Sequence, residues 1–143
     1  MKPSRALLAL VAGLFVLVEA LNSAGLLRLI GTAFQWLTQQ PRLVASLAAA
    51  SGTAIVSNAM NNLPVALAGG AALSRAPQLS HAVLIGVNLG PNLSVTGSLA
   101  TILWLIALRR DGVEITRWQF FKTGLIVMPV ALLLSVIALW LVA

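Results

Sequence analysis

Residues 51–70 read SGTAIVSNAMNNLPVALAGG, and this stretch decides how the chain folds. It lies in residues 43–74, a run without a charged side chain that is long for a single span. The carboxamides of this run are those of Asn58, Asn61 and Asn62. They would be costly to expose to lipid, and Pro64 removes a helical hydrogen bond. We predict a re-entrant hairpin of two half-helices with a polar turn at residues 57–63; one long tilted helix is the alternative.

Residues 76–108 pose the same problem a second time. His81 is their only ionisable side chain, and they exceed the roughly 20 residues that cross a bilayer. Their centre, residues 86–100, reads GVNLGPNLSVTGSLA. Glycine and proline at this density break a helix and free backbone amides and carbonyls. We predict a discontinuous helix with a polar, unwound centre.

The composition extends this interpretation to the whole chain. Of 143 residues, 59% are hydrophobic and 8% are charged, and the mean hydropathy is +0.99. A soluble domain carries about 25% charged residues, so this chain could not cover its own surface in water. There is no cysteine, which excludes a disulfide scaffold. The sequence therefore predicts an all-α integral membrane protein.

The other segments complete a single membrane domain over residues 1–143. The sequence predicts a first span at 6–27, an interfacial connection at 28–42, a cytoplasmic loop at 109–122 and a final span at 123–143. A cleaved secretory leader is an alternative for the first segment, with cleavage at residues 18–20. The apolar pattern continues past that point, which favours a retained span.

The basic residues set the predicted orientation. The net charge of +6 would suggest nucleic acid in a soluble domain, but here the cations lie between apolar runs, as topology signals do. With the N-terminus in the cytoplasm and the C-terminus outside, the inner cations are Lys2, Arg5, Arg109, Arg110, Arg117 and Lys122. The outer cations are Arg28, Arg42 and Arg75. This excess follows the positive-inside rule and predicts a multi-pass protein of the cell membrane that does not bind nucleic acid.

The two interrupted segments are the main functional signal. Paired interruptions of this kind indicate a transporter binding site near the membrane midplane. Opened helix ends and carboxamides offer donors and acceptors without net charge, which suits a neutral polyhydroxy solute or a small ion. The alternative is that the Asn and Ser side chains only join neighbouring helices and that glycine allows close packing.

The charged residues narrow the substrate class. In the sequence no Lys or Arg lies near either polar centre, which argues against a dicarboxylate and for a neutral solute. Glu19 is the only acid inside an apolar run, and such a carboxylate is by default a proton or cation relay. A salt bridge or an interfacial position is the alternative role for Glu19. No Walker loop, metal-ligand cluster or hydrolase triad is present, so we expect neither an enzyme nor a cofactor.

Four stretches resemble the C-terminal half of the ArsB-type arsenite efflux permeases, within the ion transporter superfamily. They are LLALVAGLFVLVEALNSAGL (7–26), VSNAMNNLPVAL (56–67), IGVNLGPNLSVTGSLATILWL (85–105) and ITRWQFFKTGLIVMPV (115–130). The resemblance implies a secondary transporter that extrudes arsenite and antimonite in exchange for protons. It also implies one repeat of an inverted-repeat transporter fold, in which each repeat ends in a hairpin and a broken helix.

The resemblance also assigns site residues and partners. At the hairpin tip they are Ser57, Asn58, Asn61 and Asn62; in the unwound helix they are Asn88, Gly90, Pro91, Asn92, Thr96, Gly97 and Ser98. Members of the family are longer and carry both repeats. The missing repeat would come from a longer parent chain, a separate N-terminal half or a homodimer, and a soluble ArsA-type ATPase can energise export.

Two alternative functions stay open. One is another carrier of the same superfamily, such as a sodium–proton antiporter or a dicarboxylate or silicon carrier. The other is a membrane subunit or remnant that transports nothing.

Overall fold

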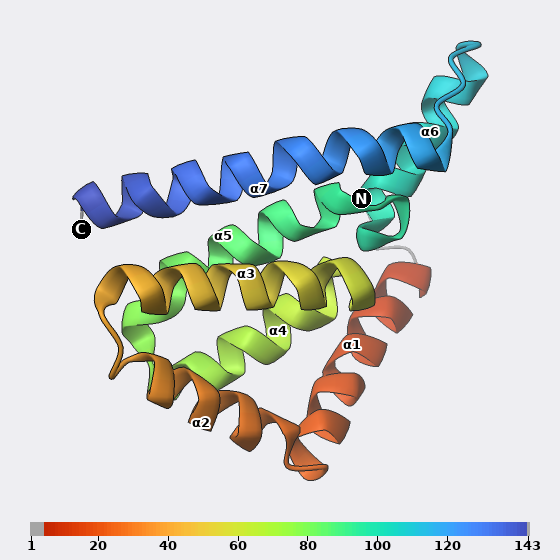
Figure 1. Cartoon of the computed structure of the whole chain (residues 1–143). Coiled ribbons are helices and arrows are strands. Elements are labelled where there is room, and N and C mark those ends of the chain that lie inside the picture. Colours follow the sequence, from red (N-terminus) through yellow and green to blue (C-terminus); the bar gives the residue numbers. More distant parts are fainter. Residues whose placement is uncertain (1–4, 143) are drawn as a thin grey trace.

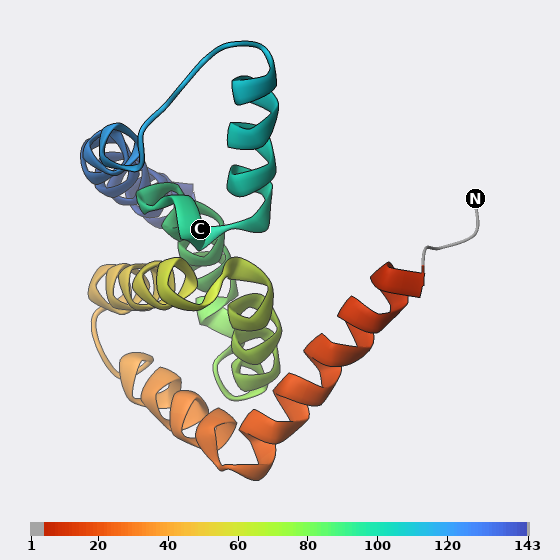
Figure 2. The ribbon, with the colours of Figure 1, turned by 90° about the vertical axis from the view of Figure 1, so that its right-hand side faces the viewer.

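The computed structural model of the chain describes residues 5–142 and contains no β-strand in that range. The helices are α1 (Arg5–Ser23), α2 (Leu26–Leu37), α3 (Arg42–Met60), α4 (Asn62–Ala72), α5 (Ser80–Leu89), α6 (Leu99–Arg110) and α7 (Arg117–Val142). Short 3₁₀ turns lie between them: η1 (Leu73–Arg75), η2 (Pro77–Leu79), η3 (Gly90–Leu93) and η4 (Val95–Gly97). Helices α3, α4, α5 and α7 form the body, whereas α1 and α6 lean away from it (Figures 1 and 2).

The predicted hairpin region is interrupted at Asn61, inside the expected turn at 57–63. Its two arms are unequal, because α3 has 19 residues and α4 has 11. At 1.5 Å per residue, α3 is about 28 Å long. By length and composition it could cross a membrane alone, as could α7. The interruption is confirmed, and the re-entrant path of the hairpin stays a prediction.

The discontinuous helix is also confirmed. Helix α5 ends at Leu89, the chain makes two 3₁₀ turns, and α6 begins at Leu99. Helix α7 begins at Arg117 and runs through Pro129 for 26 residues. Residues 117–122 are thus helical, and the segment between α6 and α7 is shorter than the predicted loop at 109–122.

Residues 5–37 contain an elbow that the sequence did not predict. Gly25 has φ 76°, and the helices on either side of it are bent by 73°. Glycine adopts this left-handed conformation without a Cβ clash, so it ends α1 and lets α2 start in a new direction. The predicted first span at 6–27 is therefore not one straight helix. By length and composition, Ala12–Ser23 of α1 and Leu26–Leu37 of α2 together could form one broken span or a re-entrant loop.

Close packing of small residues holds α3 against α5. A Cβ on Gly86 would lie 2.2 Å from the Ala50 carbonyl oxygen, and one on Gly90 would lie 2.2 Å from that of Ala54. Small residues at such contacts let two helix backbones approach closely, as they do in membrane bundles. The Ser57 hydroxyl, fully buried, crosses the same interface and donates to the Val87 carbonyl at 3.0 Å.

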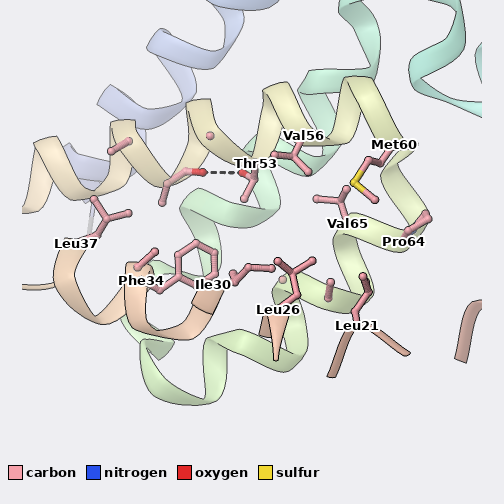
Figure 3. A pocket seen from close by; sticks show the side chains of 16 residues that line it. Leu21, Leu26, Ile30, Phe34, Leu37, Thr53, Val56, Met60, Pro64 and Val65 are labelled. Carbon is pink, nitrogen blue, oxygen red and sulfur yellow. Dashed lines mark hydrogen bonds between the residues drawn. The ribbon is translucent and has the colours of Figure 1, made fainter. Parts of the chain in front are cut away.

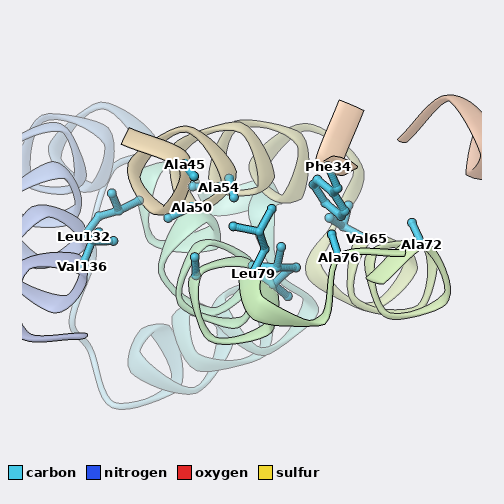
Figure 4. Close-up of a cluster of buried hydrophobic side chains, with 14 of the residues drawn as sticks. Phe34, Ala45, Ala50, Ala54, Val65, Ala72, Ala76, Leu79, Leu132 and Val136 are labelled. Atoms are coloured by element: carbon cyan, nitrogen blue, oxygen red, sulfur yellow. The ribbon is translucent and has the colours of Figure 1, made fainter. Parts of the chain in front are cut away.

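Larger apolar side chains fill the space around this contact. Phe34, Val65 and Leu79 pack on one part of it, and Leu132 and Val136 from α7 pack on another (Figure 4). Only one face of α7 is buried; outward-facing residues such as Ile126 and Leu134 are 70% and 61% exposed. The body therefore presents apolar surface to lipid or to protein. Packing within the body also places both helix breaks at the same end of the α3–α5 pair, where α3 and α5 have their C-termini.

Candidate functional site

The first helix break is made by Asn61. Its φ of 76° and ψ of 148° lie in a region that residues other than glycine rarely adopt. Its side-chain oxygen accepts a hydrogen bond from the Leu63 amide at 3.4 Å and so caps α4. Pro64 is the third residue of α4, where no helical partner for its nitrogen is needed. Asn and Pro together thus end one helix and start the next.

The second break is made by residues 90–98. Ser94 and Ser98 are extended, with φ of −138° and −147°, and separate the two 3₁₀ turns from each other and from α6. The Ser98 hydroxyl accepts a hydrogen bond from the Ala100 amide at 3.1 Å and caps α6. Each break therefore ends one helix at its C-terminus and opens another at its N-terminus.

The two breaks meet. The Ser94 hydroxyl donates to the Asn58 side-chain oxygen at 2.7 Å, although 36 residues separate them. The Thr96 hydroxyl lies 3.2 Å from that of Ser94. Gly97 allows the approach, because a Cβ there would lie 2.9 Å from the Asn58 oxygen. The candidate site is therefore the contact between the end of α3 and the unwound segment.

This contact leaves the NH₂ group of Asn58 as its free hydrogen-bonding group. Since its oxygen accepts from Ser94, its NH₂ group is the part left to bind another molecule. The N-termini of α4 and α6 begin beside it and add partial positive charge, while the ends of α3 and α5 add free carbonyls. The lining can thus both donate to and accept from hydroxyl groups.

A cation does lie beside this site, which corrects the sequence analysis. Ser94 and Thr96 share a pocket of about 370 Å³ with Arg117, Trp118 and Phe121. Gly124 explains the approach: a Cβ there would lie 2.4 Å from the Asn92 carbonyl oxygen, so α7 packs directly on the unwound segment. The expectation that no Lys or Arg lies near either polar centre is therefore wrong. It failed because Arg117 is distant from Ser94 in the sequence, and only the packing of α7 on the unwound segment places the two residues in one pocket.

The two aromatic residues of this pocket stack on each other, and a neighbouring cation lies over one of them. The rings of Trp118 and Phe121 stack with centroids 5.8 Å apart, and the Lys122 ammonium lies 5.3 Å from the Trp118 ring centroid. A cation at this distance from an aromatic face is attracted to it. The first turn of α7 therefore presents positive charge next to the second break.

The other predicted site residues fall into two groups. Gly90, Pro91 and Gly97 are buried in the break, and Asn62 is half-buried at the first position of α4. Ser57 is fully buried and its hydroxyl is engaged by Val87, so it serves the helix contact.

Asn88 and Asn92 lie differently. Both are exposed, and each donates to its own helical backbone: Asn88 to the Leu84 carbonyl at 2.8 Å, Asn92 to the Asn88 carbonyl at 3.4 Å. Within the described residues they make no hydrogen bond to the hairpin. Both side chains are exposed to whatever packs against the end of α5 and against η3.

Glu19 lies away from both breaks. It lines a pocket with Arg28 and Arg75, next to the C-terminal end of α4, whereas the break at Asn61 is at the N-terminal end. An apolar cavity of about 310 Å³ lies between α2, α3 and α4; its lining includes Phe34, Val56 and Met60 (Figure 3). The polar site and the pocket of Glu19 are therefore two separate places in the fold.

Two residues of the site escaped the sequence analysis. Ser94 belongs to the polar run at 86–100, but nothing local showed that its hydroxyl would reach Asn58. Arg117 lies in a hydrophilic stretch that suggests only topology, and no spacing rule connects it to Ser94. Both depend on tertiary packing.

Comparison with known proteins identifies relatives along almost the whole chain. The family model ArsB, described as "Arsenical pump membrane protein", matches residues 2–143. The arsenical pump membrane protein of Yersinia enterocolitica is 31% identical over 134 residues, which are 89% of this chain and 31% of that protein. Its namesake in Escherichia coli K12 gives the same identity and coverage.

A further relative carries a less specific name. An uncharacterised transporter of Mycobacterium tuberculosis is 30% identical over 142 residues, which are 91% of this chain and 33% of that protein. The chain thus spans about a third of the length of the curated relatives it matches. No solved structure matches the chain.

Proposed function

The chain belongs to the ArsB family of arsenical pump membrane proteins, and from that premise we propose that it takes part in exporting arsenite and antimonite across the cell membrane. The observation that supports this most is the hydrogen bond between Asn58 and Ser94, which joins two helix breaks in a membrane protein. Broken helices that meet in this way are the usual form of a transporter binding site.

The chemistry of the contact suits arsenous acid, which is neutral and carries three hydroxyl groups. The Asn58 amide can donate to one oxygen, and the Thr96 hydroxyl, whose hydrogen is directed to Ser94, can accept from a hydroxyl of the solute. The helix N-termini at Asn62 and Leu99 favour electron-rich oxygen without requiring a full negative charge. The chain contains no cysteine, so these residues would contribute oxygen and nitrogen groups and no thiolate to the site.

The remaining parts of the transporter belong to the same proposal. Sites of this type lie between two repeats, and Asn88 and Asn92 expose carboxamides that a second repeat could meet. That repeat would come from a longer parent chain, a separate N-terminal half or a second copy. An ArsA-type ATPase is a proposed partner, and the N-terminus is proposed to be cytoplasmic with the C-terminus outside.

Exchange with protons is the proposed energy source, and Glu19 is the proposed proton carrier. It is the only acid in the apolar helices, and it is exposed in a polar pocket. Replacing it by Gln removes the titratable group at nearly constant shape. Glu19→Gln should abolish the pH dependence of export in inverted membrane vesicles while arsenite binding persists. Unchanged pH dependence would remove Glu19 from the mechanism.

The site itself is tested by removing its two polar partners. Asn58→Ala and Ser94→Ala should each reduce arsenite export from cells by about tenfold, because the first removes a donor to the solute and the second removes the hydrogen bond that orients Asn58. Ser51→Ala is the matched control, because Ser51 is exposed on α3 and lies outside the contact. Membrane abundance is measured for every variant. Normal export by both site variants would refute the assignment.

Arg117 supports a second candidate function, transport of an anion such as a dicarboxylate. A fixed guanidinium beside Ser94 and Thr96 is what an anionic substrate needs. One variant distinguishes arsenite export from anion transport. Arg117→Gln should leave arsenite export intact if the substrate is neutral, and it should abolish transport if the substrate is an anion. Arg110→Gln is the control, because Arg110 is exposed at the end of α6 and outside that pocket.

A further inference from the structure

Two arginines from distant parts of the chain line one pocket at the elbow. Arg28 lies in the first turn of α2 and Arg75 lies in η1, after α4. With Glu19 and Asn22 of α1 they border a pocket of about 430 Å³. The pocket therefore gathers charge from three helical segments of a protein that is otherwise poor in charge.

The side chain of Arg75 packs against Gly31 of α2. A Cβ on Gly31 would lie 3.1 Å from Cδ and 3.7 Å from Nε of Arg75, so the side chain crosses α2 where a larger residue would displace it. Gly31 is buried, and it follows Arg28 by three residues, which places both on one face of α2. The fold thus holds two guanidinium groups along the same helix face.

The charges of this pocket do not balance. It contains two guanidinium groups and one carboxylate. The chain has three acids in all, and the other two, Asp111 and Glu114, lie in the segment after α6 and do not line it. Glu19, Arg28 and Arg75 are all exposed, so an anion can reach the pocket from outside, where two guanidinium groups attract it and one carboxylate repels it. One positive charge is therefore left for an external anion.

We propose that this pocket binds a phosphate-type oxyanion, supplied either by a phospholipid headgroup or by free phosphate. Arginine forks match phosphate oxygens in pairs of hydrogen bonds, and basic pockets between membrane helices bind anionic headgroups. The site is separate from the contact at Asn58 but shares Glu19, the proposed proton carrier, so it is tested by binding and not by arsenite export. Glu19 competes with the anion for the two guanidinium groups.

The neighbouring apolar cavity gives the lipid source a structural basis. Leu21 and Leu26 line that cavity, and the residues that follow them, Asn22 and Leu27, line the charged pocket. An anion that carried an acyl chain would find apolar lining at the same elbow. A free phosphate would not use it.

The test measures binding to the full chain purified in detergent. The probes are a short-chain phosphatidylglycerol, the phosphatidylcholine of the same chain length, and inorganic phosphate. We expect phosphatidylglycerol to bind more tightly than phosphatidylcholine. Arg28→Gln and Arg75→Gln should each weaken phosphatidylglycerol binding by about tenfold or more. Arg42→Gln is the matched control, since Arg42 is exposed and outside the pocket.

Two further variants keep the test decisive. Arg75→Lys retains the charge but not the paired donors, so it should bind with intermediate affinity. Glu19→Gln should bind phosphatidylglycerol more tightly than the unaltered chain. Helical content by circular dichroism establishes that each variant is folded.

The outcomes distinguish the sources of the anion. Arginine-dependent binding of inorganic phosphate as tight as that of phosphatidylglycerol supports the site with free phosphate as its ligand. Tighter, arginine-dependent binding of phosphatidylglycerol supports a lipid headgroup. Equal binding of both lipids by folded protein without arginine-dependent binding of inorganic phosphate, or equal losses in Arg42→Gln and Arg75→Gln, overturns the proposal.

Discussion

Two places in this molecule share a backbone angle and differ in almost everything else. Gly25 and Asn61 both have φ 76°, and each separates two helices. A Cβ on Gly25 would meet nothing within 4 Å, so the elbow stands in open space. Asn61 keeps a side chain in a strained conformation and uses it to cap α4, three residues after the contact between Asn58 and Ser94.

The two positions place different demands on the residue that occupies them. The elbow needs only a residue that tolerates positive φ, and glycine does so without strain. The break at Asn61 retains a strained asparagine where glycine would be more comfortable. Strain of about 1–3 kcal/mol persists only where the surroundings hold it, and it gathers at binding sites. The comparison therefore favours Asn61 as part of a site and Gly25 as a bend.

The largest expected effect comes from the packing that holds the breaks in place. Gly90→Ala should destabilise the protein by about 1–3 kcal/mol or more, because the new Cβ would overlap the Ala54 carbonyl oxygen. Gly52→Ala, on the open side of α3, should be neutral or stabilising. Thermal unfolding in detergent measures both. Equal stability of the two variants would show that the α3–α5 contact is looser than described.

At the elbow, Gly25→Ala should cost about 1–2 kcal/mol, the strain of placing a Cβ in the left-handed region. Gly25→Asn should cost less, since asparagine tolerates that region better. The same unfolding measurement tests this order. A larger loss in the asparagine variant would mean that contacts, and not φ, govern the elbow.

Ser94→Ala should lower stability by about 1 kcal/mol through loss of the hydrogen bond to Asn58. Ser74→Ala removes a hydroxyl that bonds only within its own turn, to the Ala71 carbonyl, and should change stability less. Unfolding midpoints of the two variants give the comparison. If the serine variants were equally stable, the link between the breaks would contribute nothing.

The smallest stability effect, and the sharpest contrast, is expected for Asn61→Gly. Relief of strain and loss of a weak cap offset each other, so stability should stay within about 1 kcal/mol. Arsenite export should nevertheless fall if Asn61 belongs to the site. Unchanged export in this variant would show that Asn61, like Gly25, serves only to bend the chain.

The sequence predicted the breaks well because their cause is local. Carboxamides and Pro64 in a charge-free run indicate an interrupted helix, and the break is found at Asn61. Gly90, Pro91 and Gly97 likewise predicted the unwound segment between α5 and α6.

What the sequence could not predict depends on tertiary packing. The elbow rests on one glycine in an apolar run, and many such glycines remain helical. The approach of Arg117 to Ser94 requires α7 to pack through Gly124 onto the unwound segment, and no local pattern encodes that. For the same reason the pairing of Ser94 with Asn58 could not be predicted.

The contact between the end of α3 and the unwound segment can be tested directly, because the chain contains no cysteine. The measurement is cross-linking in membranes, by a short bifunctional thiol reagent, of a variant carrying Asn58→Cys and Ser94→Cys. A variant carrying Asn22→Cys and Ser94→Cys is the control, since Asn22 lies in the pocket at the elbow. The account predicts rapid intramolecular cross-linking of the first pair alone. Equal rates for the two pairs, or none for the first, would contradict it.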